Sequence, residues 1–220
     1  MKPVLRIGPK NYASWSMRPW LVLRHHGLPF EEHIVPLFSA PDWPQQARKA
    51  SPSGRLPVLV DDGVVIHESL AICEHLAERH PDLLLWPAEQ RARSLARALS
   101  CEMATSFGAL REAMPMNCRG TNPGFTPSEE VVEDIERIAS IWEQRRAEKP
   151  QGPFLFGAFG IVDAMYAPVA TRLRSYQLQL GGAAGAYADA LLDLPALRRW
   201  VREGTDDTPI PRYDAALHED

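Results

Sequence analysis

The sequence predicts an α/β domain followed by an all-helical domain, and two observations carry this prediction. Over residues 1–82, short apolar runs of strand length alternate with segments of helical periodicity. From Glu89 onward the periodicity is helical, with almost no alternation of β-branched residues. We therefore expect two domains, residues 1–82 and residues 88–220, joined by a linker that carries Leu and Trp.

In the first domain, strand and helix signals alternate along the chain. We expect strands at residues 4–7, 30–37 and in both arms of a hairpin, and helices at residues 16–26, 44–49 and 69–79. The hairpin is predicted by Asp62-Gly63 between two apolar runs, because its tight turn needs positive φ at both central residues. The resulting order, β-α-β-α-β-β-α, is thioredoxin-like: a small mixed sheet with helices on both faces.

In the second domain, proline, glycine and capping residues mark the helix ends. A long helix is expected over residues 88–114 because Pro115 ends it, and Ser128 is placed to cap the next helix. The later helices are expected at residues 128–148, 161–176, 184–193 and 195–203.

Composition and charge are those of an ordinary globular protein. Of the 220 residues, 24% are charged and 45% are hydrophobic, and the net charge of −4 argues against nucleic acid as a partner. No apolar run approaches the roughly 20 residues that cross a bilayer, so we expect no membrane partner. Cys73, Cys101 and Cys118 lack CxxC spacing, which predicts reduced thiols in the cytoplasm and no metal site.

Residues 51–80 carry the most informative motif. Leu56-Pro57 opens the apolar strand PVLV, the Asp-Gly turn reverses the chain, and Glu68-Ser69 begins an amphipathic helix. The missing N–H of Pro57 leaves the residues before it open to a ligand, and a helix start offers free N–H groups to a carboxylate. This combination resembles the glutathione-binding half of the cytosolic glutathione transferases, and the resemblance extends over nearly the whole chain.

The resemblance implies a site for each part of glutathione. In the family, the bond before the proline is cis, the residue after it binds the cysteinyl backbone, and the polar pair binds the γ-glutamyl group. For Ser69 the alternative is a plain helix cap, and for Arg55, matched to the glycyl carboxylate, a solvated charge. The implied glutathione-binding residues are Arg55, Leu56, Pro57, Val58, Glu68 and Ser69.

The loop NYASWSMRPW, residues 11–20, lies where the family places the side chain that donates a hydrogen bond to the sulfur. That donor holds the thiol, whose ordinary pKa is about 8.5, as a thiolate. Counting back from Arg18 along the motif of serine-type members places Asn11 at the first serine, whereas a small shift of the loop places Ser14 there. Ser14 is the first candidate and Asn11 the second, with helix capping as the alternative for Ser14 and Ser16. The loop has no cysteine, which argues against omega-type members that form a mixed disulfide.

The segment SCEMATSFGALREAMP resembles the first long helix of zeta-like members. Met103, Phe107 and Arg111 recur at a spacing of four and share one face, which in the family overlooks the second-substrate pocket. An ordinary core stripe is the alternative, strongest for Phe107, and Arg111 can meet an acidic electrophile or an acidic neighbour. Further along, Asp163 and Gly160 resemble the family's folding motif, which gives Asp163 a structural role.

The resemblance therefore implies a bacterial, zeta-like or serine-type glutathione transferase. Glutathione is its co-substrate, no metal is needed, and the thiolate attacks a small electrophile in a cytoplasmic detoxification role. A narrower version resembles maleylacetoacetate isomerase, in which glutathione adds and leaves again. The alternatives are a glutathione-dependent peroxidase or disulfide reductase, which Asn11 keeps open, and a non-catalytic glutathione-binding protein. A homodimer is also implied, and the electrophile stays open.

Overall fold

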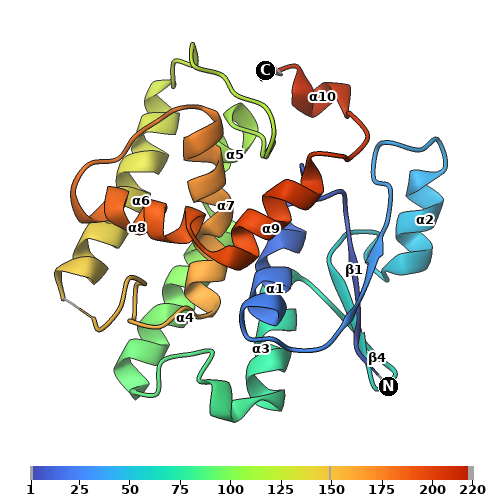
Figure 1. Ribbon diagram of the computed structural model, residues 1–220, viewed down its shortest axis with the longest axis horizontal. Helices are drawn as coiled ribbons and strands as arrows, with labels where there is room; N and C mark the ends of the chain where they lie inside the picture. Colours follow the sequence, from blue (N-terminus) through green and yellow to red (C-terminus); the bar gives the residue numbers. More distant parts are fainter. Residues whose placement is uncertain (1, 149, 218–220) are drawn as a thin grey trace.

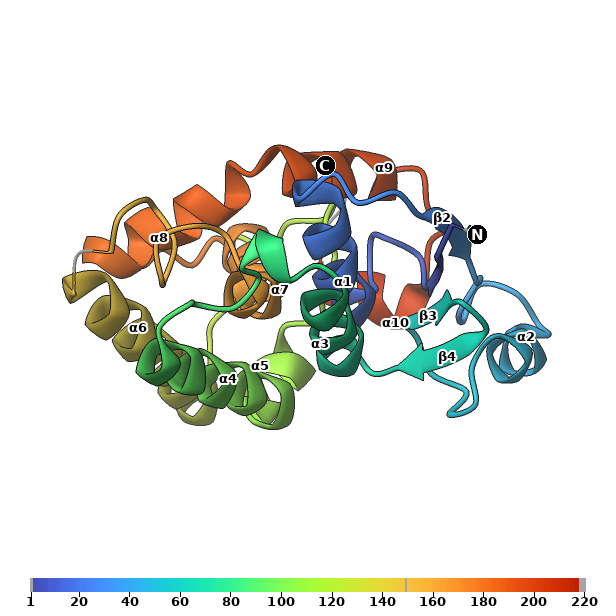
Figure 2. The ribbon, with the colours of Figure 1, turned by 90° about the horizontal axis from the view of Figure 1, so that it is seen from below.

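The structure, a computed structural model, describes residues 2–148 and 150–217. Within these residues a four-stranded sheet with its own helices forms one side of the molecule, and a bundle of helices forms the other (Figures 1 and 2). The predicted fold class, a thioredoxin-like domain followed by an all-helical domain, is confirmed. None of the described helices is long and apolar enough to cross a membrane.

The sheet has the strand order β2-β1-β3-β4. Its strands are β1 (Val4–Ile7), β2 (Glu31–Ile34), β3 (Val58–Asp61) and β4 (Val64–His67). β1 pairs in parallel with β2 and antiparallel with β3, and β3 and β4 form the predicted hairpin. The turn between them has φ values of 46° at Asp62 and 81° at Gly63, the positive sign that a tight hairpin turn needs.

Three helices accompany the sheet along the chain: α1 (Ser14–His25), α2 (Trp43–Ala50) and α3 (Ser69–Arg79). α1 and α3 lie between the sheet and the helical domain, whereas α2 lies on the outer side (Figures 1 and 2). α3 has the predicted bounds, but α1 begins two residues before the expected start at residue 16. The earlier start places Ser14 in the first turn of α1.

After a short 3-10 turn (Pro81–Leu83), helices make up most of the remaining chain. They are α4 (Gln90–Thr105), α5 (Gly108–Ala113), α6 (Glu129–Ala147), α7 (Ile161–Ser175), α8 (Gly182–Leu192), α9 (Pro195–Gly204) and α10 (Pro211–Asp214). The single helix expected over residues 88–114 is wrong, because α4 and α5 are separated at Ser106 and Phe107. Phe107 has a left-handed φ of 64°, which a continuous helix does not permit. The short helix α10 was not predicted.

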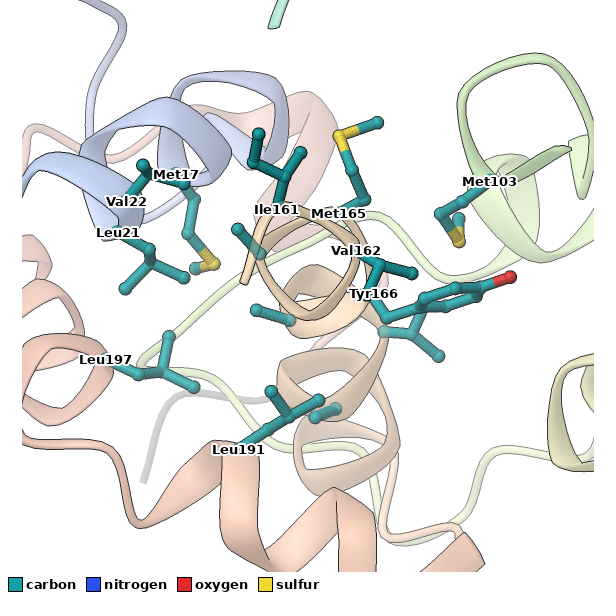
Figure 3. Packing of buried hydrophobic residues seen from close by; sticks show 14 of the residues in the cluster. Met17, Leu21, Val22, Met103, Ile161, Val162, Met165, Tyr166, Leu191 and Leu197 are labelled. Carbon is teal, nitrogen blue, oxygen red and sulfur yellow. The ribbon is translucent and has the colours of Figure 1, made fainter. Parts of the chain in front are cut away.

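α7 is the central helix of the molecule. Its side chains face α1 on one side, where Met17 and Leu21 lie, and α8 and α9 on another, where Leu191 and Leu197 lie (Figure 3). All these residues belong to one hydrophobic cluster that continues from the sheet domain into the helical domain. The two domains therefore share a core, and the position of α1 depends on α7.

The start of α7 is held by Asp163, as predicted. Its carboxylate accepts hydrogen bonds from the N–H groups of Gly160 and Leu155, at 2.9 and 3.1 Å, and from the hydroxyl of Tyr187 at 2.8 Å. Gly160 lies so close to the interdomain connection that an added Cβ would stand 2.8 Å from the carbonyl oxygen of Leu85. This close approach explains why glycine stands at the N-cap, where a side-chain hydroxyl is otherwise favoured.

Lys10 connects the first loop to both domains. Its ammonium lies 2.5 Å from a carboxylate oxygen of Glu32 and 2.5 Å from one of Glu203, and it stands over the rings of Trp20 and Trp200. The indole N–H of Trp200 donates to the backbone carbonyl of Lys10 at 2.8 Å. These contacts hold the backbone at Lys10 in place, and the position of the following loop, residues 11–14, depends on it.

Candidate active site

A cleft of about 770 Å³ lies between the two domains. The first loop and the start of α1 line it together with residues 52–56 and α2. The helical domain contributes residues of α5, α7 and the C-terminal segment. Four of its lining residues are arginines, and no carboxylate is found among the described lining residues; the arginines are Arg48, Arg55, Arg111 and Arg172. A volume of this size suits a small-molecule ligand, and the charge suits an anionic one.

Ser14 lies on this cleft at the first position of α1. No described side chain caps the helix, because the N-cap residue is Ala13, so the first turn presents free N–H groups beside the Ser14 hydroxyl. The positive end of a helix and a nearby hydroxyl together suit an anionic sulfur. Ser16 also lines the cleft, but it is only 1% exposed, and its Oγ accepts a hydrogen bond from the backbone N–H of Gly8 at 3.2 Å.

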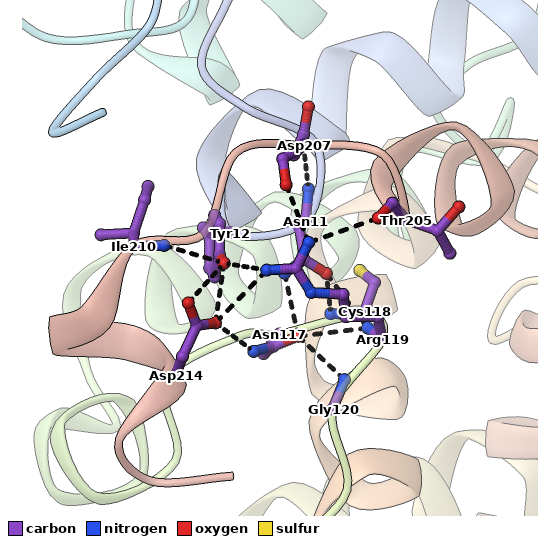
Figure 4. Close-up of polar contacts among 10 residues, drawn as sticks. All are labelled: Asn11, Tyr12, Asn117, Cys118, Arg119, Gly120, Thr205, Asp207, Ile210 and Asp214. Carbon is purple, nitrogen blue, oxygen red and sulfur yellow. Dashed lines mark hydrogen bonds and ion pairs between the residues drawn. The ribbon is translucent and has the colours of Figure 1, made fainter. Parts of the chain in front are cut away.

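Asn11 is part of the protein interior, not of the cleft wall. Its Oδ1 accepts from the backbone N–H groups of Cys118 and Arg119, at 2.8 and 3.0 Å, and its Nδ2 donates to Asn117 Oδ1 at 2.9 Å (Figure 4). The side chain is completely buried, and both ends of its amide are engaged. The structure thus places Asn11 where its amide supports the loop after α5, which argues against the expected role as sulfur donor.

The residues matched to glutathione binding divide into two groups. Arg55 and Leu56 line the cleft, and the Leu56-Pro57 bond is cis, as the resemblance implies. Pro57 and Val58 are buried directly behind Leu56, at the start of β3. Neither is among the described lining residues of the cleft, and their contact with the cysteinyl backbone stays a prediction.

Glu68 and Ser69 form the start of α3 and do not line the cleft as the structure describes it. Glu68 is exposed and has a left-handed φ of 70°. The Ser69 hydroxyl donates to the backbone carbonyl of Trp15 at 2.8 Å. Pro19, four residues further along α1, has no N–H to offer that carbonyl, so Ser69 takes the place of the missing helix donor. Their binding of a γ-glutamyl group stays a prediction.

Of the three residues expected in the second-substrate pocket, the structure brings one to the cleft. Met103 and Phe107 have exposed fractions of 1% and 4% and belong to the hydrophobic core. Because the helix breaks at Phe107, the spacing of four does not keep the three side chains on one face. Arg111 lines the cleft, stands over the Trp15 ring, and donates to the carbonyls of Met103 and Ser106 that the break leaves free.

Comparison with known proteins identifies the family. The model of the glutathione S-transferase N-terminal domain matches residues 12–79, and that of the C-terminal domain matches residues 127–203. Glutathione S-transferase F10 of Arabidopsis thaliana is 31% identical over 172 residues, which cover 75% of this chain and 79% of that protein. This chain belongs to the glutathione S-transferase family.

Other relatives within the glutathione S-transferase family are named for a particular reaction. A probable maleylacetoacetate isomerase of Caenorhabditis elegans is 37% identical over 109 residues, half of each chain. The maleylacetoacetate isomerase of Rattus norvegicus is 29% identical over 147 residues, 60% of this chain and 66% of the rat protein. The chain thus aligns with about half to two thirds of the length of these isomerases.

Solved structures of the glutathione S-transferase family have the same fold. A Burkholderia glutathione transferase homolog, solved with bound glutathione, matches with a TM-score of 0.72 at 24% identity, over 94% of this chain and all of that chain. Glutathione transferase Omega 2C of Trametes versicolor matches with a TM-score of 0.71 at 20% identity, over 97% of each chain.

The C-terminal segment forms part of the cleft wall, which the sequence did not indicate. Ile210 and Tyr213 line the cleft, and Tyr213 stacks on Tyr12 with 5.6 Å between ring centroids. The Tyr12 hydroxyl donates to Asp214 at 2.7 Å and accepts from the backbone N–H of Ile210 at 3.1 Å and from Arg119 at 2.8 Å (Figure 4). Burial and the neighbouring Asp214 carboxylate raise the pKa of Tyr12. The Tyr12 hydroxyl therefore holds the C-terminal segment against the first loop.

Replacing Tyr12 by phenylalanine should loosen the C-terminal segment. The change removes the hydroxyl that accepts from the Ile210 N–H and donates to the Asp214 carboxylate. Loss of these hydrogen bonds should lower the free energy of unfolding by about 1–3 kcal/mol. Hydrogen–deuterium exchange should rise over residues 207–217. Tyr213→Phe is the matched control, because no hydrogen bond of its hydroxyl is found among the described residues. Equal exchange in the two variants would contradict the role given to the Tyr12 hydroxyl.

Proposed function

We propose that the protein is a glutathione transferase that binds glutathione in the cleft and activates its sulfur for attack on a small electrophile. One observation carries the proposal: a single cleft brings together Ser14 at a helix N-terminus, the Arg55-Leu56 loop, and Arg111 from the helical domain. The loop supports binding of the peptide, Ser14 supports activation of the sulfur, and Arg111 lies on the side left for a second substrate.

The chemistry follows from what Ser14 and its helix offer a thiol. A hydroxyl donor and the free N–H groups of the first turn favour the charged form of the sulfur, so the thiol loses its proton to water and its pKa falls. The arginines of the cleft add positive charge in the same direction. The resulting thiolate then forms a bond with the electrophilic carbon of the second substrate, and either a leaving group departs with its bonding pair or the π electrons of an attacked double bond move onto the group conjugated to it.

A maleylacetoacetate-isomerase-like reaction is the narrower form that we favour. Three relatives carry that name, one of them as a probable assignment, and the cleft has four arginines with no carboxylate among its described lining residues, which suits an acidic electrophile. The peroxidase or disulfide-reductase alternative has less support, because the Asn11 amide on which it depended is engaged inside the protein. A homodimer in the cytoplasm follows from the family resemblance and stays a prediction.

Calorimetric titration with glutathione tests the binding step. We expect saturable binding at one site per chain, and Arg55→Ala should raise Kd about fivefold, since an exposed contact with a carboxylate is worth about 1 kcal/mol. Arg91→Ala, an exposed arginine of α4 outside the cleft, is the matched control and should leave Kd unchanged. Absence of glutathione binding would reject the proposed function; if binding is found, a panel of electrophiles that includes maleylacetone then separates conjugation from isomerisation.

A further inference from the structure

Arg172 is a buried cation that points from the helical domain to Ser14. It lies on α7 with an exposed fraction of 5%, and it lines the cleft. Its Nε donates to the carbonyl of Met114 at 2.7 Å, and its Nη1 donates to the carbonyl of Pro168 at 3.0 Å. These two bonds fix the guanidinium plane, and the remaining Nη2 stands 3.5 Å from Ser14 Oγ.

The charge of Arg172 is not neutralised by a carboxylate. Of the described acidic residues, none lies within ion-pair distance of Arg172, Arg111 or Arg18. Arg18 is completely buried against the ring of Trp15, and none of its three guanidinium nitrogens has a hydrogen-bond partner among the described residues. Burial, with the nearby Arg111, lowers the pKa of Arg172 to about 10, which still leaves it protonated at neutral pH. Arg111 and Arg172, which line the cleft, and Arg18 behind it therefore carry positive charge that no described carboxylate pairs with.

The contact with Arg172 determines whether the Ser14 hydroxyl acts as a hydrogen-bond donor or acceptor toward a ligand. A serine hydroxyl has one proton to donate and two lone pairs that accept. Since all of the guanidinium N–H groups are donors, Ser14 Oγ can only accept from Arg172, and its own proton stays available for another acceptor. A distance of 3.5 Å is long for an N–H···O hydrogen bond, so the contact orients the hydroxyl weakly.

We propose that Arg172 is a positioning residue that acts through Ser14: it holds the hydroxyl as a donor to the sulfur of glutathione. The proposal rests on the proposed function, in which Ser14 is the sulfur donor. In this step the thiol proton leaves to water, the Ser14 O–H donates to the sulfur, and Arg172 keeps all of its protons. No bond to carbon forms and no group is oxidised or reduced.

The pKa of bound glutathione tests the proposal without any electrophile. The ultraviolet absorbance of the thiolate, titrated against pH in the saturated complex, gives this pKa. Arg172→Met should raise it by roughly one to two units, the effect of losing one directed hydrogen bond from Ser14 to the charged sulfur. Arg172→Gln keeps donors for the Met114 and Pro168 carbonyls and should show the same direction, so it serves if the methionine variant does not fold.

Two comparisons separate positioning from other roles. The Kd of S-methylglutathione, which has no thiol to ionise, should change less than threefold in the Arg172 variants, whereas a purely structural role would weaken it as well. Arg111→Met is the matched control, because Arg111 is a cation of the same cleft whose bonds go to Met103 and Ser106. It should shift the pKa of the thiol less than Arg172→Met does, and an equal shift would overturn the proposal.

A double-mutant cycle with Ser14→Ala tests the path through the hydroxyl. In the Ser14→Ala background the further effect of Arg172→Met should fall to less than half of its effect in the wild type. An undiminished effect would mean that Arg172 acts on the sulfur directly, and the proposal would be wrong while the proposed function stood. Absence of glutathione binding by the wild-type protein, in contrast, would reject the proposed function itself.

Discussion

Replacing Ser14 by alanine should lower kcat/KM about 10²- to 10³-fold, the cost of removing one preorganised donor to a developing anion. The hydroxyl lies on the cleft at the uncapped start of α1, so its loss leaves the sulfur with the backbone N–H groups alone. In the binary complex the pKa of the glutathione thiol should rise toward that of the free thiol. Stopped-flow rates and the absorbance of the thiolate, both measured as functions of pH, follow the two effects.

Two controls make the Ser14 result specific. Ser16→Ala, two residues along α1, removes a hydroxyl that accepts from the backbone N–H of Gly8 and is 1% exposed, against 6% for Ser14. Its kcat/KM should stay within about threefold of the wild type, as expected for a change of a few tenths of a kcal/mol. Ser14→Thr keeps a hydroxyl and should recover part of the activity. If Ser14→Ala leaves the pKa of the bound thiol unchanged, Ser14 is not the sulfur donor.

Replacing Asp163 by alanine should destabilise the folded protein by about 3–5 kcal/mol, because three buried donors lose their acceptor. The donors are the N–H groups of Leu155 and Gly160 and the hydroxyl of Tyr187. α7, the helix that Asp163 begins, carries the shared core of both domains. Urea unfolding, followed by circular dichroism, gives the free energy of unfolding, and the midpoint of thermal unfolding should fall by roughly 10 °C.

A surface acid provides the comparison for Asp163. Glu133 is exposed on α6, and Glu133→Ala should change the free energy of unfolding by less than about 0.5 kcal/mol. Asp163→Asn keeps the shape and one accepting oxygen, so its loss should lie between those of the two alanine variants. A loss below 1 kcal/mol for Asp163→Ala would show that the start of α7 is held by packing instead of by this carboxylate.

Local signals predicted most of the fold. The hairpin depends on Asp62 and Gly63 alone, and α3 depends on its own apolar periodicity, so both were predictable from short stretches of sequence. The break between α4 and α5 was not, because the helical spacing continues through Ser106 and Phe107. The left-handed Phe107 is stabilised by burial of its ring in a core that forms from distant parts of the chain.

The site was predictable where it is built from neighbours in sequence. Ser14 follows from the loop before α1, and Leu56 follows from the proline that opens β3. The role of Arg172 could not be predicted in this way. Its partner Ser14 stands 158 residues earlier, on another domain, and nothing in the sequence of α7 indicates the contact. The hydrogen bonds of Asn11 to the loop around Cys118 were unpredictable for the same reason, because the two residues are 107 positions apart.

The bond between Tyr12 and Asp214 also has a consequence for synthesis of the chain. The two residues are 202 positions apart, which a ribosome translating 5–20 residues per second takes about 10–40 s to cover. During that interval β1, β3 and α1 are already made, but Ile210 and Tyr213, which close one wall of the cleft, do not yet exist. A nascent chain can thus have its sheet and its serine in place before it has a complete cleft. Completion of the cleft waits until residues 210–213 have been translated.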